Sequence, residues 1–427
     1  MTDPSAVESA VGDAHRRGWG LVLAATVRVA RDLDLAEECV QEAYAAALVS
    51  WRRDGIPDNP EAWLTTTAKR RAMDAIQRER VLRTKLPLLV EPEATHREWE
   101  DTAVNEPPGL AIEDVYDVVS DQRLRLIFMC CHPALAQEAQ LALTLRLVCG
   151  VSTGDVARAF LVSETTMAAR MTRAKKKIVL TRIPFRVPRS AELPDRLRGV
   201  LGVVHLLFTM GHTAPSGTSL VRSDLVEQAM HLARTLRELM PDEREVRGLL
   251  ALLLVTDARR ATRVDDEGRL LRLEDQDRSR WDVSAVAEAA ALIVEALKAG
   301  PPGRYVLQAA IASLYAEAPT FDSTDWAQIV DLYDALHSVW PSPVVALNRT
   351  VALAMVAGPA TALAEVEQLE RDGTLAEYHY LQAIKADLLQ RLGRPAEAGV
   401  AYAAALTLVD NDAEREFLTA RMSALRP

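Results

Sequence analysis

Long apolar runs are missing from this 427-residue sequence, and no basic-then-apolar segment opens it. A membrane-spanning helix needs about 18 or more consecutive apolar residues, and a secretory signal needs a charged end followed by an apolar core. We therefore expect a cytoplasmic protein with no membrane partner. The length is too great for one ordinary core, so two or three domains are expected.

Cysteine is scarce and is not spaced for a structural zinc site. The four cysteines, Cys39, Cys130, Cys131 and Cys149, form no CxxC pair. Adjacent cysteines within an apolar run, as at Cys130 and Cys131, are typical of buried thiols. We predict no metal and no cofactor.

Catalytic motifs are also absent. The sequence contains no P-loop and no GxGxxG, and no Ser/His/Asp order or paired carboxylates can be defended from it. We therefore predict that the chain is not an enzyme.

Few segments read as strands, whereas Ala- and Leu-rich helical periodicity runs through most of the chain. This pattern predicts an all-α protein. A proline-rich, acidic stretch from Leu86 to Asp117 indicates a linker, and Pro184, Pro188 and Pro194 mark a second boundary. The expected units are 1–85, an acidic linker over 86–118, 119–183, and a helical extension over 190–427.

The net charge of −10 is unevenly distributed. Residues 1–190 carry 26 Lys/Arg against 26 Asp/Glu, and residues 191–427 carry 24 against 34. Lys69 to Lys85 holds seven cations and two acids, and Arg170 to Arg189 holds eight cations and no acid. Two basic islands therefore precede an acidic extension, which favours a nucleic-acid partner.

The second basic island belongs to a segment that reads as two short helices around a turn, Gly150–Ile178. Ser152 with Asp155 is a capping-box pattern, and Ser163 can cap the second helix. The second helix carries one apolar stripe, formed by Met167, Met171, Ala174 and Ile178. This pattern predicts a helix-turn-helix, whose second helix reads the major groove while flanking cations bind phosphates. A solvated basic helix is the simpler alternative.

The helix expected over Leu33–Trp51 should begin at a capping pair, Asp34 with Glu37. One side of it is apolar. The other carries an acidic, hydrogen-bonding patch suited to a basic protein partner or merely to solvent, formed by Glu37, Glu38, Gln41 and Glu42.

The segment Pro57–Arg80 combines an apolar side with the first basic island. Its cations, with Trp63 and nearby threonines, suit single-stranded nucleic acid, which is bound by positive grooves with stacking surfaces. Alternatively, Arg70, Asp74 and Arg78 form a simple ion-pair ladder at i, i+4 spacing.

The last unit, Leu392–Asn411, resembles the second half of a tetratricopeptide repeat. Gly393 stands at the turn between helices, and Ala398, Tyr402 and Ala405 stand at the small-aromatic-small packing positions. Such repeats must stack on their neighbours to bury their apolar faces.

The order of these motifs resembles an extracytoplasmic-function sigma factor of the sigma-70 family. AEECVQEAYAAAL resembles region 2.2, NPEAWLTTTAKRRAMDAIQRER resembles regions 2.3 and 2.4, and GVSTGDVARAFLVSETTMAARMTRAKKKI resembles region 4.2. Residues 1–85 are thus identified as a region 2 domain and 119–183 as a region 4 domain. Residues 190–427 resemble the tetratricopeptide-like extension of one sigma subfamily.

The resemblance implies partners and site residues. Core RNA polymerase, through its β′ clamp helices and β subunit, is expected to meet Glu37, Glu38, Gln41 and Glu42. The −10 promoter element is expected to meet Trp63, Lys69, Arg70, Arg71, Asp74 and Arg78. The −35 element is expected to meet Thr165, Thr166, Arg170, Arg173, Lys175, Lys176 and Lys177. Ala168 and Ala169 replace polar residues common in other sigma factors, which leaves few base-reading groups.

The sequence is also compatible with two other functions. A helix-turn-helix regulator with a ligand- or protein-binding repeat domain needs no polymerase-binding helix, and a helical-repeat adaptor needs no DNA. For a sigma factor, the acidic extension could modulate activity by lying against the basic islands, or could have a positive, structural role. The polar segment Leu273–Asp282 either docks the extension or binds a ligand, or is an exposed loop that caps a helix starting near Trp281.

Overall fold

The computed structural model describes residues 3–85, 122–160, 162–181, 183, 188 and 192–425. The predicted acidic linker, 86–118, lies outside these residues. The described parts are all-α, as predicted, with no strand among them. They form two compact units, Met1–Val151 with Ala168–Val200, and Ser152–Met167 with Leu201–Pro427.

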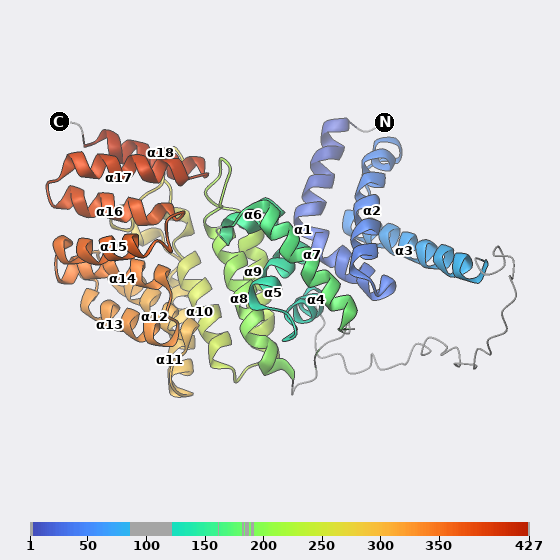
Figure 1. Cartoon of the computed structure of the whole chain (residues 1–427), viewed down its shortest axis with the longest axis horizontal. Helices are drawn as coiled ribbons and strands as arrows, with labels where there is room; N and C mark the ends of the chain where they lie inside the picture. The colour runs from blue at the N-terminus through green and yellow to red at the C-terminus, as the bar shows by residue number, and fades with distance from the viewer. Residues whose placement is uncertain are drawn as a thin grey trace, which may run out of the picture. The chain divides into compact units, whose positions relative to one another are not determined.

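In the described residues up to 181, the chain forms seven helices, shown in blue to green in Figure 1. Their bounds are α1 Pro4–Ala30, α2 Leu33–Asp54, α3 Pro60–Lys85, α4 Gln122–Cys130, α5 Gln137–Leu147, α6 Thr153–Ala159 and α7 Glu164–Leu180.

The first unit is built on α1, α2 and α3, which pack against one another. A buried aromatic pair joins α1 to α2, because Trp19 and Tyr44 stack with ring centroids 5.9 Å apart. The Tyr44 hydroxyl donates to the Ala14 carbonyl at 3.1 Å, and Trp19 Nε1 donates to the Leu147 carbonyl at 3.1 Å. Buried polar atoms on both rings are thus hydrogen-bonded, as a close-packed interior requires.

Gly20 permits a close approach between α1 and the end of α5. A Cβ atom at this position would lie 2.0 Å from the Val148 carbonyl oxygen, which is backbone and cannot rotate away. Only glycine fits here, so this contact fixes where the chain after α5 meets α1.

Local capping signals place the ends of three of these helices. Ser152 Oγ accepts from the Asp155 amide at 3.0 Å, and Ser163 Oγ accepts from the Thr166 amide at 3.2 Å, both as predicted. The prediction for α2 was wrong. Its N-cap is Asp32, whose carboxylate accepts from the Leu35 amide at 2.8 Å, because Asp34 already lies within the first helical turn.

The predicted apolar stripe of α7 is buried, with Met167, Met171, Ala174 and Ile178 at most 6% exposed. All four cysteines are free and buried, in line with their reading as core thiols. Burial raises the pKa of Cys131 and Cys149 to about 12, so both thiols stay protonated at neutral pH.

Residues 192–425, which are all described, form eleven α-helices that are separated by turns and by short 3-10 segments. Their bounds are α8 Leu193–His212, α9 Ser223–Leu239, α10 Arg244–Asp257, α11 Val283–Lys298, α12 Arg304–Glu317, α13 Trp326–Val339, α14 Pro343–Val356, α15 Pro359–Asp372, α16 His379–Arg391, α17 Pro395–Leu408 and α18 Asp412–Ser423. From α9 onward each helix packs against the next, and α14 to α18 run side by side in orange to red in Figure 1.

Asn411 ties the last helix of this stack to the loop after α8. Its Oδ1 caps α18, while its Nδ2 donates to the carbonyls of Ala214 and Ser219, each at 3.1 Å. The residue is 1% exposed and all its side-chain polar atoms are bonded, so it fixes two segments about 200 residues apart in the sequence.

The pair α16 and α17 has the local features that the repeat pattern predicted. Gly393 adopts φ +70° at the turn, a conformation that favours glycine, and Ala398, Tyr402 and Ala405 are buried between the helices. The assignment of the whole extension to tetratricopeptide repeats stays a prediction.

The polar segment Leu273–Asp282 forms two 3-10 turns, Leu273–Asp275 and Arg278–Arg280. Asp282 caps α11, because its carboxylate accepts from the amides of Ser284 and Ala285 at 3.0 Å. The capping role predicted for this segment is confirmed, at a helix that begins two residues after Trp281.

Candidate nucleic-acid interface

The acidic patch of α2 contains side chains that form no ion pair among the described residues and side chains that are paired within the molecule. Glu38 and Gln41 are exposed, whereas Glu42 is 50% exposed and forms an ion pair with Arg71 of α3. Glu37 is only 13% exposed and faces into the unit. Of the predicted polymerase contacts, Glu38 and Gln41 are therefore the most accessible.

Glu37 is held by cations that come from later in the sequence. Lys175 Nζ of α7 lies 2.7 Å from Glu37 Oε2 and 2.8 Å from Asp34 Oδ1, and Arg146 Nη2 of α5 lies 3.5 Å from Glu37 Oε1. Burial lowers the pKa of Lys175, but its hydrogen bonds with Asp34 and Glu37 outweigh this effect and leave the pKa raised. Lys175 is thus a fixed cation that joins α7 to α2.

The first basic island occupies α3. Arg70 and Arg78 are exposed, and Lys69 is half-buried. Trp63 is half-buried at the start of this helix and packs edge-to-face on Trp51, with ring centroids 5.6 Å apart. Its ring is thereby oriented by the core while part of it stays accessible for stacking.

The ion-pair ladder considered for α3 does not form. Arg78 Nε donates to the backbone carbonyl of Asp74 at 3.3 Å, and no ion pair joins the Asp74 carboxylate to Arg70 or Arg78 in the described structure. The exposed cations of α3 consequently keep a surplus of positive charge available for an anionic partner.

The second basic island lies on α7. Thr165 and Thr166 are exposed in its first turn, where Thr166 Oγ1 also lies 2.8 Å from Ser163 Oγ. Further along, Arg173, Lys176 and Lys177 are exposed and Arg170 is half-buried. The helix therefore presents hydroxyls at its N-terminus and cations behind them, the arrangement that a recognition helix needs.

The first helix of the helix-turn-helix contacts the extension. Arg158 Nη2 of α6 donates to Ser216 Oγ at 3.1 Å, and Ser216 Oγ donates to Asp155 Oδ1 at 3.1 Å. Arg158 Nε also lies 4.0 Å from Asp410 Oδ2. Burial acts to raise the pKa of Asp155, but hydrogen bonds from Ser152, Arg158 and Ser216 outweigh it and leave the pKa lowered.

Asp34, Arg146 and Ser216 take part in these contacts although no motif in the sequence marks them as partners. Lys175 and Glu37 are 138 residues apart, and Arg158 and Ser216 are 58 apart. No local pattern links residues at such separations, so only the folded chain reveals them.

The geometry defines a class of protein: an all-α chain with an acidic helix, a basic helix that bears a tryptophan, and a basic helix-turn-helix. Family comparisons agree with it. Residues 17–81 match sigma-70 region 2, residues 125–178 match sigma-70 region 4, and residues 196–297 match a family of unknown function, DUF6596. An uncharacterized protein of Rhizobium meliloti is 40% identical over 428 residues, covering 100% of this chain and 97% of that protein.

The chain belongs to the sigma-70 family of RNA polymerase sigma factors, and the order of its regions is that of an extracytoplasmic-function-like member with a C-terminal extension. It is accordingly a transcription initiation factor, with core RNA polymerase and promoter DNA as partners. No helix in the described ranges is long and apolar enough to cross a membrane.

Proposed function

We propose that this chain is an alternative sigma factor of the extracytoplasmic-function subfamily that acts in the cytoplasm. It recruits core polymerase through α2, captures the melted −10 element on α3, and engages the −35 element with α7. The chain performs no catalysis itself. The proposal rests on one observation: each of the three helices exposes side chains of its predicted set. They are Glu38 and Gln41 on α2, Arg70 and Arg78 on α3, and Thr165, Thr166, Arg173, Lys176 and Lys177 on α7.

The proposed contact between α2 and polymerase is electrostatic. The β′ clamp helices would supply a basic surface for Glu38, which forms no ion pair with any residue that the structure describes. Glu42 is a less suitable probe, because reversing its charge would also break its pair with Arg71 inside the molecule.

Charge reversal at Glu38 tests this contact. Glu38→Arg should weaken binding of core polymerase by about tenfold or more, as loss of a favourable pair and a new like-charge contact together predict. Asp58→Arg, at an exposed acid in the loop before α3, is the matched control and should bind normally. Equal affinity of the Glu38→Arg and Asp58→Arg proteins for core polymerase, measured by fluorescence anisotropy, would remove α2 from the interface.

For the extension we propose a positive, positioning role. Ser216 and Asp410 contact Arg158 on α6, and α6 in turn supports the turn that leads into α7. The first turn of α7, with Thr165 and Thr166, stays exposed, which favours support over masking. The extension would thus hold the helix-turn-helix in register for the −35 element.

The positioning role of the extension is tested by placing a second cation, Ser216→Arg, opposite Arg158. Ser216→Arg replaces a hydrogen bond by like-charge repulsion and should lower transcription from a promoter with a −35 element, while core polymerase binding is unchanged. Ser284→Arg, which alters an exposed site near the cap of α11, is the control. A rise in transcription with Ser216→Arg would favour inhibition by the extension instead.

A further inference from the structure

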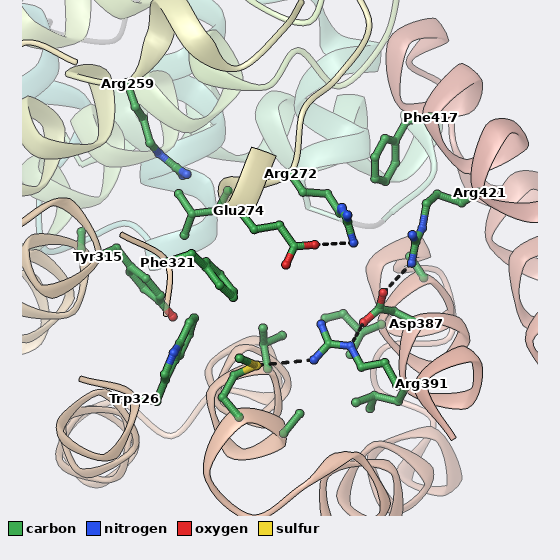
Figure 2. Close-up of a pocket in the computed structure, with 18 of the residues that line it drawn as sticks. Arg259, Arg272, Glu274, Tyr315, Phe321, Trp326, Asp387, Arg391, Phe417 and Arg421 are labelled. Atoms are coloured by element: carbon green, nitrogen blue, oxygen red, sulfur yellow. Dashed lines mark hydrogen bonds and ion pairs between the residues drawn. The ribbon is translucent and has the colours of Figure 1, made fainter. Parts of the chain in front are cut away.

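A cavity lies within the C-terminal extension, at a distance in sequence from every promoter-binding residue. Its volume is about 430 Å³, and it is lined by α10, α12, α13, α14, α16, α17 and α18. Arg272 and residues of the polar segment Leu273–Asp282 line one side of it. This volume falls in the range that binds small organic molecules. Figure 2 shows its side chains converging from these elements.

One side of the cavity is aromatic. Tyr315 and Phe321 each meet Trp326 edge-on, with ring centroids 5.4 and 5.0 Å from that of Trp326. In Figure 2 these three rings gather on the side opposite Arg421. Such a wall suits a planar apolar body, which aromatic side chains contact at ordinary stacking distances.

The opposite side is polar and already paired. Asp387 is clamped between two arginines, with Arg421 Nη2 2.6 Å from Oδ1 and Arg391 Nε 2.7 Å from Oδ2. Arg272 forms ion pairs with Glu274 and Asp275. These groups are mutually satisfied, so they form a fixed polar rim.

Arg259 is the exception among the charged groups of the lining. No hydrogen bond or ion pair joins its side chain to another residue in the described ranges, and Figure 2 shows it pointing into the cavity without a partner. Burial lowers the pKa of Arg259, and the nearby Arg278 adds to this effect. Arg278 itself has a buried Nη2 without a hydrogen bond.

The net charge of the residues that line the cavity also favours an anionic ligand. Four arginines and two carboxylates line the cavity, which leaves an excess of two positive charges. A partly buried guanidinium without a counter-ion is unfavourable, and an anionic group from outside the chain relieves it with charge-assisted hydrogen bonds.

We propose that this cavity binds a small organic carboxylate with a planar apolar body. The carboxylate accepts hydrogen bonds from Arg259, and the planar body lies against Phe321 and Trp326. The inference does not depend on promoter recognition, because binding is a property of the chain alone.

The test uses 2-naphthoate as the probe and its neutral analogue 2-naphthamide as the reference, with the full-length protein in isothermal titration calorimetry. We expect saturable 2-naphthoate binding with a Kd below about 1 mM, and 2-naphthamide binding about tenfold weaker. Arg259→Met should weaken 2-naphthoate binding by about tenfold while leaving 2-naphthamide binding unchanged. Arg234→Met, at an arginine 48% exposed on α9 and outside the cavity, should bind both probes normally.

Circular dichroism and thermal unfolding verify that each variant is folded. If Arg259→Met fails to fold, Arg259→Lys, which keeps the charge but loses the planar fork, should show a smaller loss for 2-naphthoate alone. The proposal is overturned if 2-naphthoate shows no saturable binding to the wild type. It is also overturned if 2-naphthamide binds equally well, or if the Arg259 variants bind 2-naphthoate with wild-type affinity.

Discussion

Comparing Lys175→Gln with Lys176→Gln distinguishes a structural cation from a DNA-binding one. The resemblance to sigma factors implies that both residues contact phosphates. In the folded chain Lys175 is bound between Asp34 and Glu37, whereas Lys176 is exposed on the same helix. The two substitutions remove the same charge from neighbouring positions and should therefore have different consequences.

The expected loss of stability follows from the burial of the two ion pairs. Exposed pairs contribute about 0–1 kcal/mol, and breaking a fully buried pair costs about 3–5 kcal/mol. The Lys175 and Glu37 side chains are 21% and 13% exposed, but Asp34 is 69% exposed and adds little. We expect Lys175→Gln to lower the free energy of unfolding by about 1–3 kcal/mol, and Lys176→Gln to change it by less than about 0.5 kcal/mol.

The assays are urea unfolding and duplex binding of the full-length protein at several salt concentrations. A lost phosphate contact reduces the slope of log K against log salt by about 0.9, so Lys176→Gln should show this change. Lys175→Gln should keep the wild-type slope while its unfolding midpoint falls. The reasoning is refuted if Lys175→Gln flattens the salt slope as Lys176→Gln does and leaves stability unchanged.

Two further substitutions test the packing of each unit. Gly20→Ala places a Cβ against the Val148 carbonyl and should lower the free energy of unfolding, measured in urea, by about 3 kcal/mol or more. Gly12→Ala on the same helix is the control, because its Cβ meets only the flexible end of an arginine, and it should be neutral or stabilising. His212 is 8% exposed, and burial lowers its pKa to about 2, so the native state binds its proton less readily than the unfolded chain. The free energy of unfolding should therefore fall as the pH drops below 6.5, and this residue should account for about 2 kcal/mol of the loss at pH 5. His212→Gln should flatten this pH dependence. An unchanged pH profile of the variant would contradict the burial of His212 as a neutral group.

Helix caps and apolar stripes could be predicted from the sequence. The caps at Ser152 and Ser163 and the apolar stripe of α7 depend on residues three or four positions apart, so their spacing alone predicts them. The cap of α2 shows the limit of this approach, because Asp34 with Glu37 has the capping-box spacing, yet Asp32 is the residue that caps the helix. The choice of Asp32 depends on where α1 ends: its last residue is Ala30, and Arg31, with φ +52°, is its C-cap, so Asp32 directly precedes the first residue of α2.

Contacts between distant segments could not be predicted. Lys175 reads as one of three equivalent lysines, and only its packing against α2 makes it different. Arg259 likewise has no motif around it, and its lack of a partner is visible only once seven helices surround the cavity. The distinct roles of Lys175 and Arg259 therefore come from tertiary structure rather than from local sequence.

Promoter-dependent run-off transcription with purified core polymerase tests the central claim most directly. We expect specific transcripts only when this chain is added, and we expect Glu38→Arg to remove them while Asp58→Arg does not. Transcription unaffected by the chain, together with tight binding of the chain alone to duplex DNA, would contradict the sigma-factor account and favour a helix-turn-helix regulator.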